Sequence, residues 1–378
     1  MFESAKSKHR NNRGMVVILA LATMMLVVTA ALELHISERA NMMSSAVMRD
    51  RATLEQMCAS GINLAMAMLI KDRMESESDS LQEDWADNET IATLLTEIPF
   101  EEGTLELEIM DELSKIQINA LLQFPEGRNM NNSQQELWSR FAGGLLAFME
   151  SSEGEKEKAK GDKKATGDKE DDIDPVTIIS CLKDWLDSGD DDAITGLNGA
   201  ESDYYESLDP PYACKNGPFD HLSELRLVKG ITPELFAGVG DAAGLGQYVT
   251  VYGAEEVADE KFSFPGKINI NTADLAVLSA LLPMENADFA PLLIEYREAT
   301  NGTLYVNDVT KLGWHNNVPG LAGAQIDSAL ISVSSQIFRV TATASLNNVQ
   351  VTTTAVIERI KPQETDPWQC KVLNWKTE

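Results

Sequence analysis

The chain has 378 residues and a formal charge of −29, from 60 acidic and 31 basic side chains. This acidity argues against nucleic-acid binding, because basic surface supplies most of the affinity for phosphate backbones. The length suits two or three domains. The four cysteines show no C-x-x-C spacing, which argues against a zinc site.

A basic leader precedes the longest apolar segment of the sequence. Residues 1–14 carry four Lys or Arg side chains, and residues 15–32 are uncharged and predominantly apolar. A helix of that length spans about 27 Å, close to the hydrocarbon thickness of a bilayer. Because a basic leader favours a cytoplasmic N-terminus, we expect a single-pass protein whose soluble body lies outside the cytoplasm.

Gly14 is the one small residue at the junction between leader and apolar segment. A secretory signal would place a small-residue cleavage site after the apolar segment, and none follows Leu32. The arrangement resembles the leaders of type IV prepilins and type II secretion pseudopilins. That resemblance implies cleavage between Gly14 and Met15 by a prepilin peptidase, and a methylated new N-terminus. The alternative is an uncut membrane anchor.

Helical periodicity continues beyond the apolar segment. Apolar residues recur at spacings of three, four and seven from Ile36 to Leu69, and the first proline is Pro99. This pattern predicts one helix over 15–71, about 85 Å long, with its transmembrane part at 15–32.

The period changes from Gly103 onward. Leu105, Leu107 and Ile109 alternate with Glu106, Glu108 and Met110, and residues 115–119 alternate between polar and apolar side chains, which predicts strands with one buried face. Near the other end, residues 337–344 and 349–357 are expected to pair as a hairpin across Asn347 and Asn348.

These strands are separated by about 200 mostly helical residues, which predicts an α/β domain with a second domain inserted into it. The expected α/β parts are residues 72–125 and 335–378, and the expected insertion is residues 126–334. Within it, residues 151–174 are almost wholly charged or small and are expected to form a disordered loop.

An acidic loop follows. Residues 184–206 hold eight acidic side chains and no basic one. Carboxylates held together in a folded loop repel one another unless a cation neutralises them, so we expect bound calcium. The expected ligands are Asp187, Asp190, Asp191, Glu201 and Asp203. The alternative is a solvated loop, and the number of ions stays open.

Cys181 and Cys214 bracket this acidic loop, and we predict a disulfide between them, since the protein body should lie in an oxidising compartment. Cys58 and Cys370 remain, and their pairing stays open.

Residues 220–330 are similar to helix-hairpin-helix modules, which bind DNA backbones. The similarity rests on the stretch Gly266–Ala273 and the helical residues 275–282 that follow it. Such modules need a glycine hairpin whose amides face phosphate, but residues 282–289 contain two acids and no glycine. Phosphate binding is therefore expected to be absent. The alternative function, a membrane-anchored DNA-uptake receptor, depends on this similarity.

The leader and four further motifs together resemble the large minor pseudopilin K family of type II secretion systems. The motifs are Asp184-Trp185-Leu186-Asp187, Gly199-Ala200-Glu201, Ser223–Gly230 and Lys267–Ala273. The resemblance implies an α+β fold with a pilin-like long N-terminal helix packed on a small antiparallel sheet. A large, mostly α-helical domain with helix-hairpin-helix-like elements would interrupt that sheet.

The resemblance also implies calcium as cofactor and the minor pseudopilins I and J as partners. Pseudopilin H, the major pseudopilin and the inner-membrane assembly platform are further candidate neighbours. The protein would lie in the inner membrane, with its body in the periplasm, and no nucleic acid would be a partner. Which exoproteins are exported stays open, as does what the tip contacts.

The fifth residue after the expected cleavage site is Leu19, where pilin-like subunits typically carry glutamate. The resemblance implies that this glutamate pairs with the terminal amine of the subunit above. Leu19 therefore predicts a tip subunit that helps initiate assembly. The sequence contains no nucleophile elbow or metal-spaced histidines, so we do not expect an enzyme.

Overall fold

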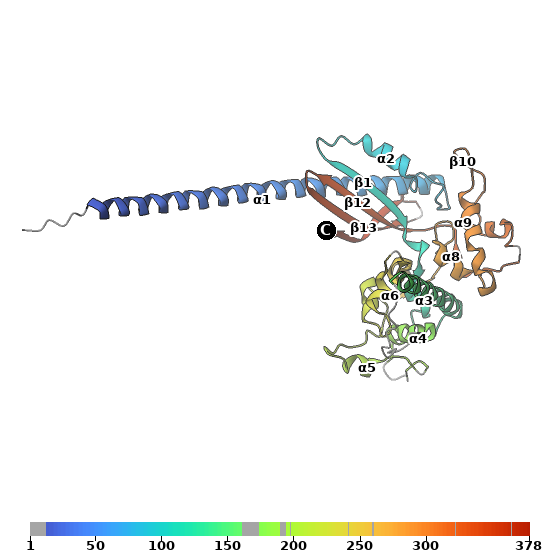
Figure 1. Ribbon diagram of the computed structural model, residues 1–378. Coiled ribbons are helices and arrows are strands. Elements are labelled where there is room, and N and C mark those ends of the chain that lie inside the picture. Colours follow the sequence, from blue (N-terminus) through green and yellow to red (C-terminus); the bar gives the residue numbers. More distant parts are fainter. Residues whose placement is uncertain are drawn as a thin grey trace, which may run out of the picture.

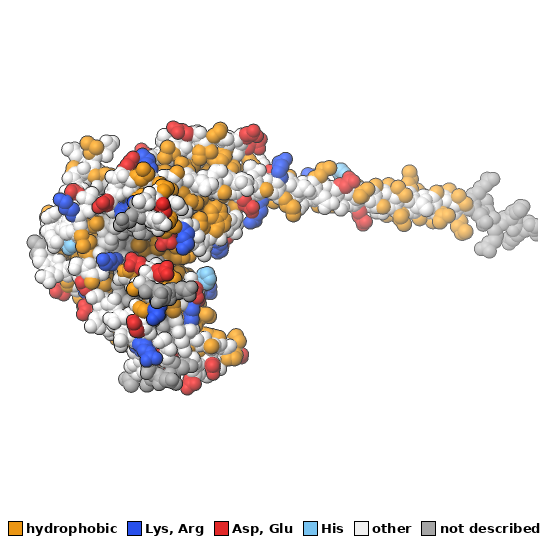
Figure 2. Space-filling view, turned by 180° about the vertical axis from the view of Figure 1, so that it is seen from behind, with side chains coloured by type: hydrophobic (Ala, Val, Ile, Leu, Met, Phe, Trp, Pro, Cys, Tyr) orange, Lys and Arg blue, Asp and Glu red, His pale blue; other side chains and the backbone are white. Residues whose placement is uncertain are grey.

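The computed structural model describes residues 13–160, 174–189, 194–196, 198–240, 242–258, 261–321, 323–363 and 365–378. Helix α1 (Arg13–Glu75) runs four residues beyond its predicted end at 71. Its residues 14–49 are all exposed, and Figure 1 shows this half projecting away from the body. Among the described residues, α1 is the one helix long and apolar enough to span a membrane. Apolar side chains cover its far end in Figure 2.

The second half of α1 packs on a four-stranded antiparallel sheet. Leu54, Ile62 and Leu69 are fully buried against the sheet, as the helical spacing predicts. Burial of each such side chain contributes about 1.5–3 kcal/mol relative to exposure. The strand order is β1-β12-β13-β14. Its members are β1 (Thr104–Asp111), β12 (Ile337–Leu346), β13 (Val349–Ile360) and β14 (Gln369–Thr377).

The predicted hairpin is formed by β12 and β13, and Asn347 has a φ of 54° at its turn. The Asn347 side-chain amide donates to Asp50 Oδ2 at 2.9 Å, where α1 leaves the protein body. The predicted strand at 115–119 is shorter than expected: β2 is only Ile116–Gln117. Both faces of this stretch are buried, and Asn119 bonds to backbone groups of Phe219, so a one-faced strand cannot form.

A second domain lies between β1 and β12 and has its own hydrophobic core. Its main helices are α3 (Asn132–Lys160), α4 (Pro175–Leu186), α8 (Leu275–Leu281) and α9 (Ala290–Glu298). Helix α3 continues to Lys160, so the loop predicted over 151–174 is wrong for residues 151–160. Six of these ten residues are Lys or Glu, which extend an existing helix readily. Residues 161–173 lie outside the described residues.

Short elements complete the chain. Helix α2 (Asn88–Thr96) lies between α1 and β1, outside the insertion. The other helical turns are η1 (Glu112–Ser114), η2 (Ile118–Leu121), α5 (Ser202–Glu206), η3 (Leu222–Leu227), α6 (Pro233–Ala237), α7 (Leu245–Tyr248), η4 (Met284–Phe289) and η5 (Trp314–Asn317). The short strands are β3 (Gly238–Val239), β4 (Ala242–Ala243), β5 (Val249–Thr250), β6 (Glu255–Ala258), β7 (Lys261–Ser263), β8 (Ile268–Asn269), β9 (Thr300–Asn301), β10 (Leu304–Tyr305) and β11 (Ile331–Ser332).

The predicted fold is therefore confirmed: a pilin-like helix on an antiparallel sheet, interrupted by a mostly helical insertion. In Figure 1 the insertion lies beside the sheet, away from the projecting half of α1.

Candidate functional site

Three buried carboxylates meet in the inserted domain. Asp184 and Asp187 lie one turn apart at the end of α4, and Glu201 immediately precedes α5. One oxygen from each side chain lies within 4.8 Å of the others, and all three residues are buried. Oxygen ligands of this kind suit calcium, so these three residues form the candidate cation site.

Asp184 is held in place by a tight loop. The backbone N–H of Thr195 donates to both of its carboxylate oxygens, at 3.1 and 3.2 Å. A Cβ on Gly199 would collide with Asp184 Oδ2 and with the backbone of Thr195, so only glycine fits there. Burial raises the pKa of Asp184, which means that its negative charge is unfavourable without a compensating cation.

Asp187 shows the clearest ligand position. Its Oδ2 accepts a hydrogen bond from Lys183 Nζ at 2.8 Å. Its Oδ1 is buried and, within the described part of the chain, has no hydrogen-bond partner. Burial of a neutral polar group without a hydrogen-bond partner costs roughly 2–7 kcal/mol, and burial of an unpaired charge costs more. This buried carboxylate oxygen therefore needs a partner. The donor set and this oxygen fit a bound cation.

Only part of the expected ligand set lies in this cluster. Asp187 and Glu201 belong to it, whereas Asp203 is exposed on α5 and lies outside it. Asp190 and Asp191 lie outside the described residues. Asp184 was missed, although its position three residues before Asp187 places both side chains on one face of a helix.

The disulfide between Cys181 and Cys214 stays a prediction, and the structure shows hydrogen bonds from both sulfurs to backbone oxygens. Cys181 Sγ donates to the carbonyl of Asn198 at 3.4 Å, and Cys214 Sγ donates to the carbonyl of Asp184 at 3.5 Å. Each sulfur is thus directed at a backbone oxygen. Burial raises the pKa of Cys181 to about 11, which keeps it protonated.

Cys58 and Cys370 also contact backbone oxygens. Cys58 lies on α1 and points at backbone oxygens of β12 and β13, while Cys370 on β14 donates to the carbonyl of Met66. Their pairing, which the sequence left open, stays open.

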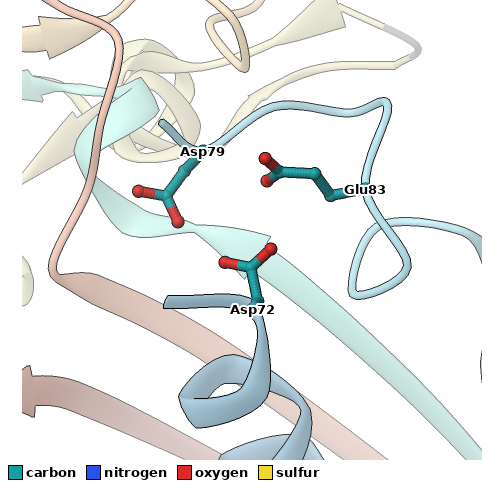
Figure 3. Close-up of side chains that lie close together, drawn as sticks. All are labelled: Asp72, Asp79 and Glu83. Carbon is teal, nitrogen blue, oxygen red and sulfur yellow. The ribbon is translucent and has the colours of Figure 1, made fainter. Parts of the chain in front are cut away.

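A second set of acidic residues lies where the two domains meet. Asp72, near the end of α1, faces Asp79 and Glu83 of the segment that follows, as Figure 3 shows. Arg359 of β13 lies among them, fully buried. It donates to Asp72 Oδ2 at 2.9 Å, to Asp79 Oδ1 and to the carbonyl of Ser335. We call Asp72, Asp79, Glu83 and Arg359 the Arg359 junction; it is an ion-pair network.

The motif at 267–273 connects the insertion to this junction. Asn269 Nδ2 donates to the Asp79 carbonyl at 3.0 Å and to Asp111 Oδ2 at 2.8 Å. Asn271 Nδ2 donates to the same Asp79 carbonyl, and its Oδ1 accepts from Trp314 Nε1. The motif that suggested a helix-hairpin-helix thus holds the two domains together.

The stretch that replaces the glycine hairpin, between α8 and α9, is the short helix η4. Gly14, Met15 and Leu19 all lie on the exposed half of α1, and residues 1–12 of the leader lie outside the described residues.

The fold is pilin-like, with a helical domain inserted between β1 and β12. Residues 168–253 match the model of the family "Type II secretion system (T2SS), protein K". Type II secretion system protein K of Klebsiella pneumoniae is 34% identical over 113 residues, 29% of each chain. The protein of the same name from Aeromonas hydrophila is 38% identical over 66 residues, 18% of this chain and 19% of the relative. Part of the chain is thus similar to type II secretion system protein K.

The aligned segments span less than a third of each of these relatives. The fold match is more extensive. The crystal structure of the GspK-GspI-GspJ complex from the enterotoxigenic Escherichia coli Type 2 Secretion System contains a chain that superimposes with a TM-score of 0.58. The match covers 88% of this chain and 99% of that one, at 19% identity, and shows that the two share a fold.

Proposed function

We propose that the chain is a minor pseudopilin that forms the tip of the type II secretion pseudopilus together with minor pseudopilins I and J. It helps to initiate pseudopilus assembly and so supports protein export across the outer membrane. The role is structural rather than enzymatic. The protein is anchored in the inner membrane by α1, with its body in the periplasm.

The observation that carries this proposal is the exposure of α1 over residues 14–49. Large apolar side chains remain accessible along this half, including Leu19 at 66% and Met42 at 73%. Exposed apolar surface of this extent marks a membrane or a protein partner. Residues 15–32 suit lipid, and the stretch beyond them suits the helices of neighbouring subunits.

Two features support a tip position. Leu19 carries no acid that would need a neighbour's terminal amine in lipid, where an unpaired charge is costly. The inserted domain adds bulk beside the sheet (Figure 1), and we infer that this bulk would obstruct a subunit stacked above. The chain that shares this fold was crystallised as part of a GspK-GspI-GspJ complex, which supports I and J as the two partners.

The tip role can be tested by where the protein lies on the pseudopilus and by how many copies each pseudopilus contains. Gold-labelled antibody against the insertion should mark one end of each pseudopilus, and affinity purification of the full chain from membranes should recover pseudopilins I and J. Many copies along the shaft would refute the tip position, and recovery without I and J would refute the partnership.

We further propose that a prepilin peptidase cuts the leader between Gly14 and Met15, and that the new N-terminus is methylated. Mass spectrometry of the membrane-extracted protein should show a chain that begins at methylated Met15. A chain that retains the leader would contradict this processing.

We also propose that Asp184, Asp187 and Glu201 bind calcium. The buried Oδ1 of Asp187 supports this site. Addition of calcium to the chelator-treated full chain in detergent should raise its melting temperature, and Asp187→Asn should remove most of that rise. Asp203→Asn is the matched control, since Asp203 is exposed outside the triad and its variant should respond like the wild type. Equal responses from the two variants would place the ion elsewhere.

A further inference from the structure

The Arg359 junction contains more negative than positive charge. Asp72, Asp79 and Glu83 face a single guanidinium, and both Arg359 and Asp79 have side chains with 0% exposure. If all three carboxylates are ionised, the surplus charge lies in a largely buried site, where solvent compensates it poorly. Such a site favours uptake of a proton.

Glu83, Asp79 and Arg359 are the charged groups that act on Asp72. Asp111 on β1 lies within electrostatic reach of Asp79, and Cys370 on β14 lies within reach of Arg359. Nearby in the sequence are Lys71, Arg73 and Glu75 on α1 and Asp84 on the connecting segment (residues 76–87). Lys71 pairs with Asp84, and Arg73 lies over the ring of Trp368. Arg359 is therefore the cation that these contacts direct at Asp72.

We propose that the Arg359 junction is a proton-sensitive latch: Asp72 binds a proton when the surroundings become mildly acidic, and this strengthens the attachment of the connecting segment and the inserted domain. The pKa of Asp72 is raised to about 7, chiefly by burial; the charges of Glu83 and Asp79 raise it by more than Arg359 lowers it. The group can thus change charge near neutral pH.

The sign follows from the direction of that shift. The pKa of Asp72 is raised from the ordinary 3.8, so the folded junction binds the proton more tightly than the opened one. The stabilisation is fully present below the ordinary value and is lost as the pH rises through about 7. Above that pH, ionised Asp72 repels Asp79 and Glu83 across the junction.

The connecting segment transmits this repulsion to the inserted domain. Asp79 binds Arg359 through its side chain, while its carbonyl accepts hydrogen bonds from Asn269 and Asn271. Gln82, three residues on, donates to the carbonyl of Arg297 on α9 at 2.6 Å. Displacement of Asp79 from the junction therefore breaks contacts of the insertion as well.

Hydrogen exchange of the full chain in detergent micelles tests the latch. Wild type and Asp72→Asn are compared at about pH 6 and about pH 8, where one proton linked to a pKa near 7 changes the opening equilibrium about tenfold. Residues 76–87 and 268–273 should exchange faster in wild type than in Asp72→Asn, and the ratio of the two rates should rise about tenfold from the lower pH to the higher.

Asp84→Asn is the matched control, because Asp84 is an exposed acid on the same segment and pairs only with Lys71 in the contacts above. It should exchange like the wild type at both pH values. If Asp72→Asn does not fold, Glu83→Gln serves instead: removal of this neighbouring charge should move the pH midpoint of exchange downward. Equal exchange of wild type and Asp72→Asn at the higher pH, or an unmoved midpoint in Glu83→Gln, would overturn the latch.

Discussion

Substitution of Arg359 by methionine should strongly destabilise the protein. The guanidinium has 0% exposure and donates hydrogen bonds to Asp72, Asp79 and the carbonyls of Leu69 and Ser335. Methionine fills similar space but leaves the fully buried Asp79 carboxylate without its cation. Removal of one partner of a buried ion pair costs about 3–5 kcal/mol.

The loss can be measured as a thermal shift. In a domain of this size each kcal/mol lowers the melting temperature by about 2–4 °C, so Arg359→Met should melt roughly 6–20 °C below wild type. Tryptophan fluorescence of the full chain in detergent is a suitable probe. Trp85 packs edge-on against Phe338 at 5.2 Å, and the Arg359 guanidinium lies 4.6 Å above the same Phe338 ring.

Two variants distinguish the loss of a buried ion pair from the general effect of replacing arginine by methionine. Arg51→Met removes an exposed pair with Glu55 and should cost less than about 1 kcal/mol. The double variant Arg359→Met with Asp79→Asn removes both charges and should recover part of the stability lost in the single variant. A single variant that lies within about 1 kcal/mol of wild type would refute the assignment of Arg359 as a structural cation.

Three further substitutions test other features. Gly199→Ala should lower stability by about 1–3 kcal/mol and weaken calcium binding, because the new methyl group collides with Asp184; Gly143→Ala in α3, whose nearest neighbour would lie at 3.8 Å, should not. Asn271→Leu should cost about 1–3 kcal/mol by urea unfolding, since Trp314 Nε1 loses its acceptor; a smaller loss would mean that water replaces the amide. Asn347→Ala should cost about 1 kcal/mol and speed proteolysis near Asp50, and unchanged cleavage would count against that contact.

The sequence predicted those parts of the fold that depend on local periodicity. The spacing of Leu54, Ile62 and Leu69 indicated α1, and the two apolar-rich stretches on either side of Asn347 and Asn348 indicated the hairpin of β12 and β13. The strand expected at 115–119 is limited to Ile116–Gln117, because surrounding residues bury both of its faces. Burial by residues that are distant in the sequence cannot be read from the local alternation of apolar and polar side chains.

The sites were less predictable, since they depend on contacts between distant residues. Asp187 and Glu201 were identified from charge density alone, which could not show that Asp184 turns inward while Asp203 stays exposed. The Arg359 junction was not anticipated, because 280 positions separate Arg359 from Asp79. The cysteines bracketed the acidic loop in sequence, but spacing could not reveal that each thiol points at a carbonyl.

The insertion also determines the order in which the molecule can fold. Asp111, the last residue of β1, pairs with Phe338 of β12, so the insertion begins and ends at neighbouring positions in one sheet. During synthesis and export, β1 emerges long before its partner strand, and the sheet cannot close until more than roughly 200 further residues have followed. The insertion, with its separate core, can fold in that interval. Because the chain enters and leaves the insertion at neighbouring positions of one sheet, a change in the length of the insertion need not disturb the strands that carry it.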